Sequence, residues 1–127
     1  MKKRVLLAED HPGTIELMQL ELEVLGYEVK VARNGLEVVE MACSDPPDLI
    51  VMDIIMPKMD GFQAIAEIRR NPETRHIPIL AATALARPGD REKCLESGCN
   101  GYIAKPFTHK QLGAAIEKVL ESAAKPA

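Results

Sequence analysis

Short apolar runs and longer amphipathic patterns alternate along the chain. Runs typical of buried strands occur at 4–8, 28–31, 48–53, 78–82 and 101–104. Between these runs, apolar residues recur every three or four positions, which is the period of a helix with one buried face. Strands that alternate with helices in this way predict a parallel sheet that is covered by helices on both faces.

Local signals predict where several helices begin and end. Asn34 and Thr108 are each followed three residues later by Glu or Gln, which is the spacing of a capping box. Asp60 can cap the helix that lies between these two, and that helix must end before Pro72. Gly26 is predicted to end the first helix.

The predicted helix between the last two strands is weaker than the others. From Asp90 to Ser97, only Cys94 and Leu95 are clearly apolar, and Gly98 follows. A helix with so little apolar surface buries little, so we expect it to belong to the least stable part of the fold.

Composition narrows the class of protein. The 127 residues predict one domain, 1–127, with a core at about 4–121 and a frayed tail at 122–127. A net charge of −3 with interspersed signs argues against binding nucleic acid. The apolar runs are too short to span a membrane, and Glu9-Asp10 interrupts any signal peptide, so we expect a cytoplasmic protein with no membrane partner.

The cysteines are odd in number, and their spacing matches no zinc site. We therefore expect Cys43, Cys94 and Cys99 to be reduced thiols, buried or half-buried. A redox pair between Cys94 and Cys99 is a minor alternative.

Four of the apolar runs end on reactive polar residues. Glu9-Asp10 follows the first run, and Asp53, Thr83 and Lys105 end or follow three others. Ligands of parallel α/β sheets bind beyond the carboxyl ends of the strands. The sequence therefore predicts one pocket that holds three carboxylates, a hydroxyl and an ammonium. Glu9 and Asp10 could instead simply cap the first helix.

Such a pocket suits a divalent cation and phosphoryl transfer. Clustered carboxylates repel one another unless a cation joins them, and hard oxygen ligands suit Mg²⁺. Asp10 and Asp53 are the predicted ligands, with Glu9 close by. An aspartate can also accept a phosphoryl group, whose charge Lys105 and the Thr83 hydroxyl would help to neutralise.

The motifs also carry a family resemblance. Their order and spacing resemble the CheY-like receiver domain of two-component response regulators, in the segments Glu9-Asp10, Asp53, Met56-Pro57-Lys58-Met59-Asp60-Gly61, Thr83-Ala84 and Lys105-Pro106-Phe107. The resemblance covers nearly the whole chain. It implies a flavodoxin-like (βα)₅ fold with a five-stranded parallel sheet of order 2-1-3-4-5. The initiating Met1 and the short tail favour a stand-alone regulator over a receiver cut from a larger chain.

The resemblance also implies a role for each pocket residue. Asp53 would accept phosphate from a histidine kinase or a histidine phosphotransferase. Asp10, Asp53 and the main-chain carbonyl of Ile55 would hold Mg²⁺, with Mn²⁺ as a possible substitute and Glu9 acting through a metal-bound water. Lys105 would pair with the phosphoryl group, and its bond to the following proline would be cis.

The implied output is a change of shape. Thr83 would move toward the phosphoryl group and the aromatic Tyr102 would swing inward with it. A plain half-buried aromatic is nearly as good an interpretation of Tyr102. The face made by the fourth helix, fifth strand and fifth helix would then bind a partner or relay phosphate. The protein would be a monomer or a weak, phosphorylation-linked dimer.

Two other functions compete with this one. A Mg²⁺-dependent phosphohydrolase of the haloacid dehalogenase type would carry a second aspartate two residues after the nucleophile, where this chain has Ile55. A flavin carrier would need a Ser/Thr/Gly-rich loop after the first strand, where Glu9-Asp10-His11 would repel a phosphate. The family resemblance also implies that two positions tune hydrolysis of the phosphoryl group, and here they are Ile55 and Leu85. Because neither apolar side chain can orient an attacking water, we expect an aspartyl phosphate that lasts well beyond seconds.

Overall fold

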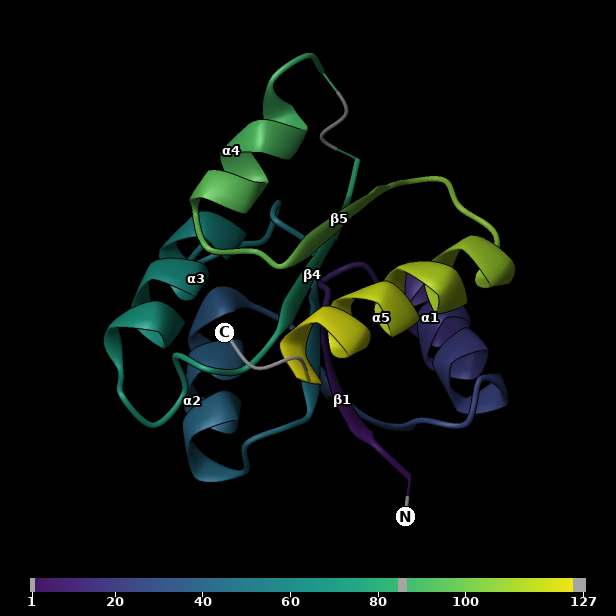
Figure 1. Cartoon of the computed structure of the whole chain (residues 1–127), viewed down its shortest axis with the longest axis horizontal. Helices are drawn as coiled ribbons and strands as arrows, with labels where there is room; N and C mark the ends of the chain where they lie inside the picture. The colour runs from purple at the N-terminus through teal and green to yellow at the C-terminus, as the bar shows by residue number, and fades with distance from the viewer. Residues whose placement is uncertain (1, 85–86, 125–127) are drawn as a thin grey trace.

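The computed structural model describes residues 2–84 and 87–124. Its five strands all run parallel in the order β2-β1-β3-β4-β5, which confirms the predicted sheet (Figure 1). The strands, in chain order, are β1 Arg4–Ala8, β2 Glu28–Ala32, β3 Leu49–Met52, β4 Ile79–Thr83 and β5 Gly101–Ala104. The predicted strands thus match closely, and β4 reaches one residue further than predicted, so that it includes Thr83.

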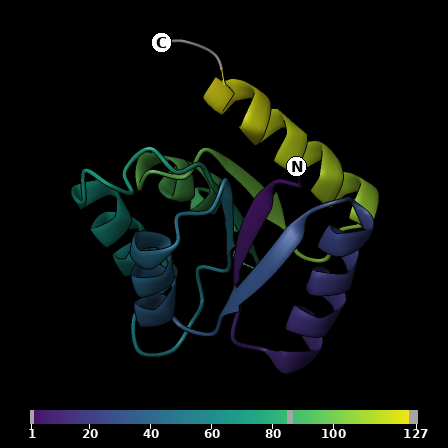
Figure 2. The ribbon, with the colours of Figure 1, turned by 90° about the horizontal axis from the view of Figure 1, so that it is seen from below.

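Helices cover both faces of the sheet. One face carries α1 (Pro12–Val24) and α5 (His109–Ala124), as Figures 1 and 2 show. The other face carries α2 (Gly35–Ser44), α3 (Gly61–Arg70) and α4 (Asp90–Glu96). Among the described residues, no helix is both long enough and apolar enough to cross a bilayer.

The alternation of side chains along the strands divides the core into two layers. In β1, Leu6 and Ala8 belong to the buried cluster that also contains residues of α2, α3 and α4. Val5 and Leu7 belong to the cluster that contains residues of α1 and α5. Both sets are at most 3% exposed, as expected for a central strand of a parallel sheet.

The predicted helix ends are present. Asn34, Asp60 and Thr108 each accept a hydrogen bond from the backbone N–H three residues later. Gly26 follows the first helix with a φ of 98°, a left-handed conformation that favours glycine.

Two expectations need correction. The helix α5 continues to Ala124, so residues 122–124 of the predicted tail are helical, and the rest of that tail lies outside the described residues. Cys43 is exposed on α2, whereas Cys94 and Cys99 are buried as expected, and all three are free thiols. An exposed side chain at position 43 fits the face of α2 that turns away from Val38 and Ala42, which are buried.

The helix α4 buries fewer residues than any other helix, which agrees with the weak apolar pattern of its sequence. It buries only Cys94, and its N-cap residue, Gly89, provides no side-chain cap. Its C-terminal end is held by α3, because the Arg69 guanidinium donates to the Gly98 carbonyl at 2.8 and 3.0 Å. Arg69 also donates to the Ile77 carbonyl at 2.7 Å. The two ends of α4 are therefore fixed very unequally.

Candidate functional site

The sheet register brings the reactive strand ends together. Ala8 and Met52 are paired neighbours in β1 and β3, so the residues that follow them leave the sheet side by side. The Asp53 N–H donates to the Ala8 carbonyl at 2.9 Å, which fixes the acidic residue next to the end of β1. On the other side of β3, Thr83 is the last residue of β4 and pairs with Ala104 of β5.

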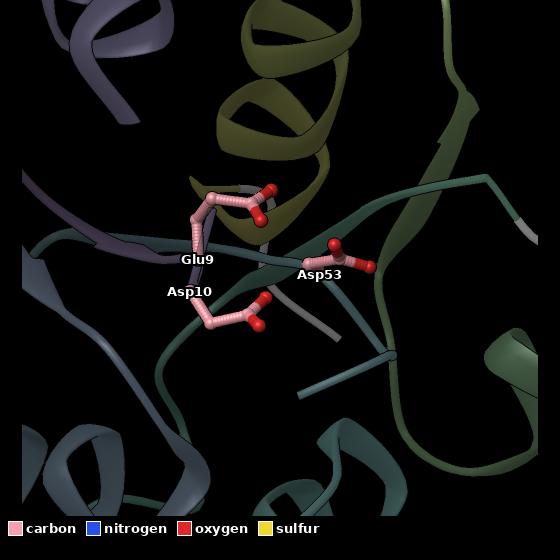
Figure 3. A group of neighbouring side chains, drawn as sticks. All are labelled: Glu9, Asp10 and Asp53. Atoms are coloured by element: carbon pink, nitrogen blue, oxygen red, sulfur yellow. The ribbon is translucent and has the colours of Figure 1, made fainter. Parts of the chain in front are cut away.

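Three carboxylates form a cluster at this edge. Oxygen atoms of Glu9, Asp10 and Asp53 all lie within 4.8 Å of one another. Figure 3 shows the Glu9 and Asp10 side chains extending from neighbouring positions toward Asp53. Glu9 is 2% exposed and Asp53 is 8% exposed, whereas Asp10 is open to solvent. A small, partly open set of carboxylate oxygens fits Mg²⁺, which keeps several of its waters.

One ammonium partly balances this charge. Lys105 Nζ lies 2.5 Å from Glu9 Oε1 and 3.1 Å from Asp53 Oδ2. Burial acts to lower the pKa of Lys105, but its bond to Glu9 and the charge of Asp53 outweigh burial and raise that pKa. The ammonium therefore stays charged, and three carboxylates face one cation. The pocket retains a negative excess that a metal ion would offset.

Glu9 is the carboxyl whose ionisation this arrangement makes less favourable. Burial raises the pKa of its carboxyl, and the nearby charge of Asp53 raises it further, while Lys105 opposes both effects. The Glu9 Oε2 atom also accepts from the His11 N–H at 3.2 Å. A buried carboxyl with a perturbed pKa beside other acids is typical of a functional site.

Thr83 and Tyr102 lie on the strands nearest α4. Thr83 is fully buried, and its carbonyl accepts from the Lys105 N–H at 3.0 Å, so it adjoins the pocket. Tyr102 is half-buried against the core layer that contains Cys94 of α4. Burial raises the pKa of Tyr102, and the thiol of Cys94 adds to the rise. Leu85 lies outside the described residues.

The loop between β3 and α3 is fixed at its two ends. The Ile55 N–H donates to Asp53 Oδ1 at 3.1 Å, while the Ile55 side chain is 55% exposed. At the other end, the Gly61 N–H donates to the Ile54 carbonyl at 2.8 Å. A Cβ on Gly61 would lie 2.6 Å from the Ile54 Cα, so only glycine lets α3 begin this close to Asp53.

The sequence matches the response regulator receiver domain over residues 5–117, which is most of the chain. The chain belongs to this family. Receiver domains are the signalling switches of two-component systems, where they act with histidine kinases or phosphotransferases and with downstream targets.

Two curated relatives of different length are similar to this chain. The polar-differentiation response regulator DivK of Brucella anthropi is 37% identical over 123 residues, which span 97% of this chain and 100% of DivK. The response regulator PleD of Caulobacter vibrioides is 37% identical over 94% of this chain, but that match spans only 26% of PleD.

Solved structures share the fold of this receiver domain. The receiver domain of the sensor histidine kinase PA1611 from Pseudomonas aeruginosa is 37% identical and has a TM-score of 0.88. The match covers 95% of this chain and 99% of that one, and that structure holds a magnesium ion in its active site cleft. The chemotaxis response regulator CheY4 of Vibrio cholerae is 28% identical over 94% of this chain and 99% of its own, with a TM-score of 0.87.

The structure of this receiver domain confirms one local expectation and adds contacts that the sequence did not reveal. The expected cis bond joins Lys105 to Pro106. His11 is exposed at the start of α1 and caps this helix, because its Nδ1 accepts from the Thr14 N–H at 3.2 Å. The Arg69 contacts were not predicted, because no local signal links Arg69 to Gly98. The close approach at Gly61 had a signal, the Asp60-Gly61 turn pair, but its packing needed the structure.

Proposed function

We propose that this receiver domain is a phosphorylation-activated switch whose phosphoacceptor is Asp53. The observation that carries this proposal is the carboxylate cluster, in which Asp53 is buried, adjoins two other acids and is paired with Lys105. Asp10, Asp53 and the Ile55 carbonyl would hold Mg²⁺, with Glu9 acting through a metal-bound water. The magnesium ion in the active site cleft of the related PA1611 receiver domain supports a metal at this acidic cluster.

The donor would be a phosphohistidine on a histidine kinase or phosphotransferase. A carboxylate oxygen of Asp53 attacks phosphorus, the new P–O bond forms as the P–N bond breaks, and the imidazole leaves. Asp53 is already oriented for this step, since Ile55 N–H and Lys105 hold its two oxygens. Mg²⁺, when bound, would neutralise charge on the transferred group. Lys105 would pair with the phosphoryl oxygens.

Thr83 and Tyr102 would transmit the change of conformation from Asp53 to α4. Thr83 adjoins the pocket, and Tyr102 lies on β5 beside α4, so the two residues connect the acceptor to the weakly anchored helix. Phosphorylation would draw the Thr83 hydroxyl toward the phosphoryl group and Tyr102 inward. The face formed by α4, β5 and α5 would then bind a partner or pass the phosphate on. We place this exchange in the cytoplasm.

The phosphoryl group would be long-lived. The exposed Ile55 side chain next to the acceptor is apolar and has no group to orient an attacking water. Leu85 is apolar as well. The chain would therefore catalyse its own phosphorylation and only slow dephosphorylation, without turning over a substrate.

Labelling with a small phosphodonor tests the proposal. Wild type, Asp53→Asn and Asp60→Asn are incubated with acetyl phosphate and Mg²⁺, and each is weighed intact by mass spectrometry. We expect one phosphoryl group on wild type and on Asp60→Asn, which keeps its helix cap. Asp53→Asn should remain unmodified. After removal of the donor, the label should persist well beyond seconds; equal labelling of Asp53→Asn would refute the assigned acceptor.

A further inference from the structure

Gly35, the first residue of α2, lies far from the reactive residues in sequence but contacts their loop. It is buried, and the backbone of Met59 passes directly over it. A Cβ on Gly35 would lie 2.7 Å from the Met59 carbonyl carbon and 2.7 Å from the Met59 Cβ, and closer still to the carbonyl oxygen. Real Cβ atoms essentially never approach another atom this closely, so any side chain at position 35 would displace the loop.

Backbone conformation does not explain a glycine at this position. The φ of Gly35 lies outside the left-handed region, so other residues could adopt it. Its helix already has an N-cap, since Asn34 Oδ1 accepts from the Glu37 N–H at 2.9 Å. Alanine has a higher helix propensity than glycine. The one property that only glycine supplies here is the absence of a side chain under Met59.

The segment that rests on Gly35 is the loop between β3 and α3. This loop starts at Asp53 and contains Ile55, whose N–H donates to Asp53 Oδ1. Near its end, the Met59 N–H donates to the Pro57 carbonyl at 2.8 Å, which makes a tight turn over Gly35. A shift of Met59 would therefore be passed along a short, hydrogen-bonded loop to the backbone of Ile55.

We propose that Gly35 is a positioning residue for the cation site. This inference rests on the proposed function, because it concerns the geometry of Asp53 and of the Ile55 carbonyl. By letting the loop pack against α2, Gly35 sets the distance between the Ile55 carbonyl and the carboxylates that follow β1 and β3. A larger residue would leave the three carboxylates in place and would move the backbone ligand.

Metal binding and the metal-free loop are measured together by NMR. Gly35→Ala should bind Mg²⁺ roughly 10-fold more weakly than wild type, as expected when a residue that orients a ligand is changed. In the metal-free protein, its amide shifts should change at residues 54–60. At saturating Mg²⁺, its labelling by acetyl phosphate should recover toward the wild-type rate.

Two controls separate this role from helix stability. Asn34→Ala removes the cap of the same helix without adding an atom under Met59, so it should lower Tm and keep wild-type Mg²⁺ affinity. Gly113→Ala adds a methyl group on α5, where it meets only the flexible end of Leu25, and should also keep wild-type affinity.

The outcomes are distinct. Wild-type Mg²⁺ affinity in folded Gly35→Ala, or an equal loss in Asn34→Ala, would overturn the role of Gly35 and leave the proposed function standing. A wild-type protein that neither binds Mg²⁺ nor accepts phosphate would overturn both. If Gly35→Ala does not fold at room temperature, it is compared with Asn34→Ala in the cold, by the rise in Tm that a fixed Mg²⁺ concentration produces. We expect a smaller rise for Gly35→Ala than for Asn34→Ala, and equal rises would overturn the role.

Discussion

The pocket at the strand ends and the helix α4 are close neighbours that are held in opposite ways. In the pocket, Glu9 and Asp53 are buried, and both contact Lys105. In α4, only Cys94 is buried, and the helix begins without a side-chain cap. The pocket concentrates charge in a fixed frame, whereas α4 makes few contacts that a rearrangement would break.

This difference fits two separate roles, with the pocket aligning the phosphoryl group and α4 changing its conformation. A pocket that must align a phosphoryl group benefits from side chains that do not reorganise. An element that reports the event must have a second arrangement close in free energy to the first. The contacts of Arg69 with the Gly98 carbonyl leave one end of α4 fixed, so a change should be largest at the end near Gly89.

The largest expected effect lies in the pocket. Lys105→Ala should slow labelling by acetyl phosphate about 10²–10³-fold, because it removes the ammonium aimed at the reacting oxygens. Lys110→Ala, on the exposed side of α5, should label like wild type. Rates are followed by intact mass at saturating Mg²⁺. A loss smaller than threefold for Lys105→Ala would mean that the pocket is not arranged as we describe.

The next largest expected effect is a loss of stability when Arg69, which holds the C-terminal end of α4, is removed. Arg69→Ala leaves several carbonyls without their charged donor, and we expect it to cost about 2 kcal/mol of unfolding free energy. Arg70→Ala is the matched control, since Arg70 forms an exposed ion pair with Glu67, and its loss should cost less than about 0.5 kcal/mol. Urea unfolding measures both. We expect Arg69→Ala to keep wild-type Mg²⁺ affinity, because Arg69 holds α4 and not the pocket. A large loss of Mg²⁺ affinity would contradict this separation of the pocket from α4.

The smallest expected effect is a dependence on pH. The pKa of Glu9 is raised in the folded state, mainly by burial. The folded protein therefore holds that proton more tightly, and the stability that Glu9 provides below its unfolded pKa is lost as the pH rises through its folded pKa. Without Mg²⁺, Glu9→Gln should lose less stability than wild type between pH 4 and pH 7, as measured by urea unfolding. Identical pH profiles would contradict this.

The sequence predicted the pocket better than it predicted the connections around it. The reactive residues follow apolar strands directly, so a correct sheet brings Asp10, Asp53 and Lys105 to one edge. Arg69 and Gly35 depend instead on how closely two helices and a loop approach, and no periodicity in the sequence encodes that distance. The helical end at Ala124 was missed because small residues follow Leu120 and weaken the apolar pattern.

We expect phosphorylation of Asp53 to rearrange α4 and to leave the rest of the frame in place. Amide hydrogen exchange, measured with and without acetyl phosphate in Mg²⁺, tests it directly. We predict that exchange changes across residues 87–98, most strongly near Gly89, while α2 is unaffected and Asp53→Asn shows no change. Unaltered exchange of α4 in fully labelled protein, or an equal change in Asp53→Asn, would show that phosphorylation of Asp53 does not rearrange α4.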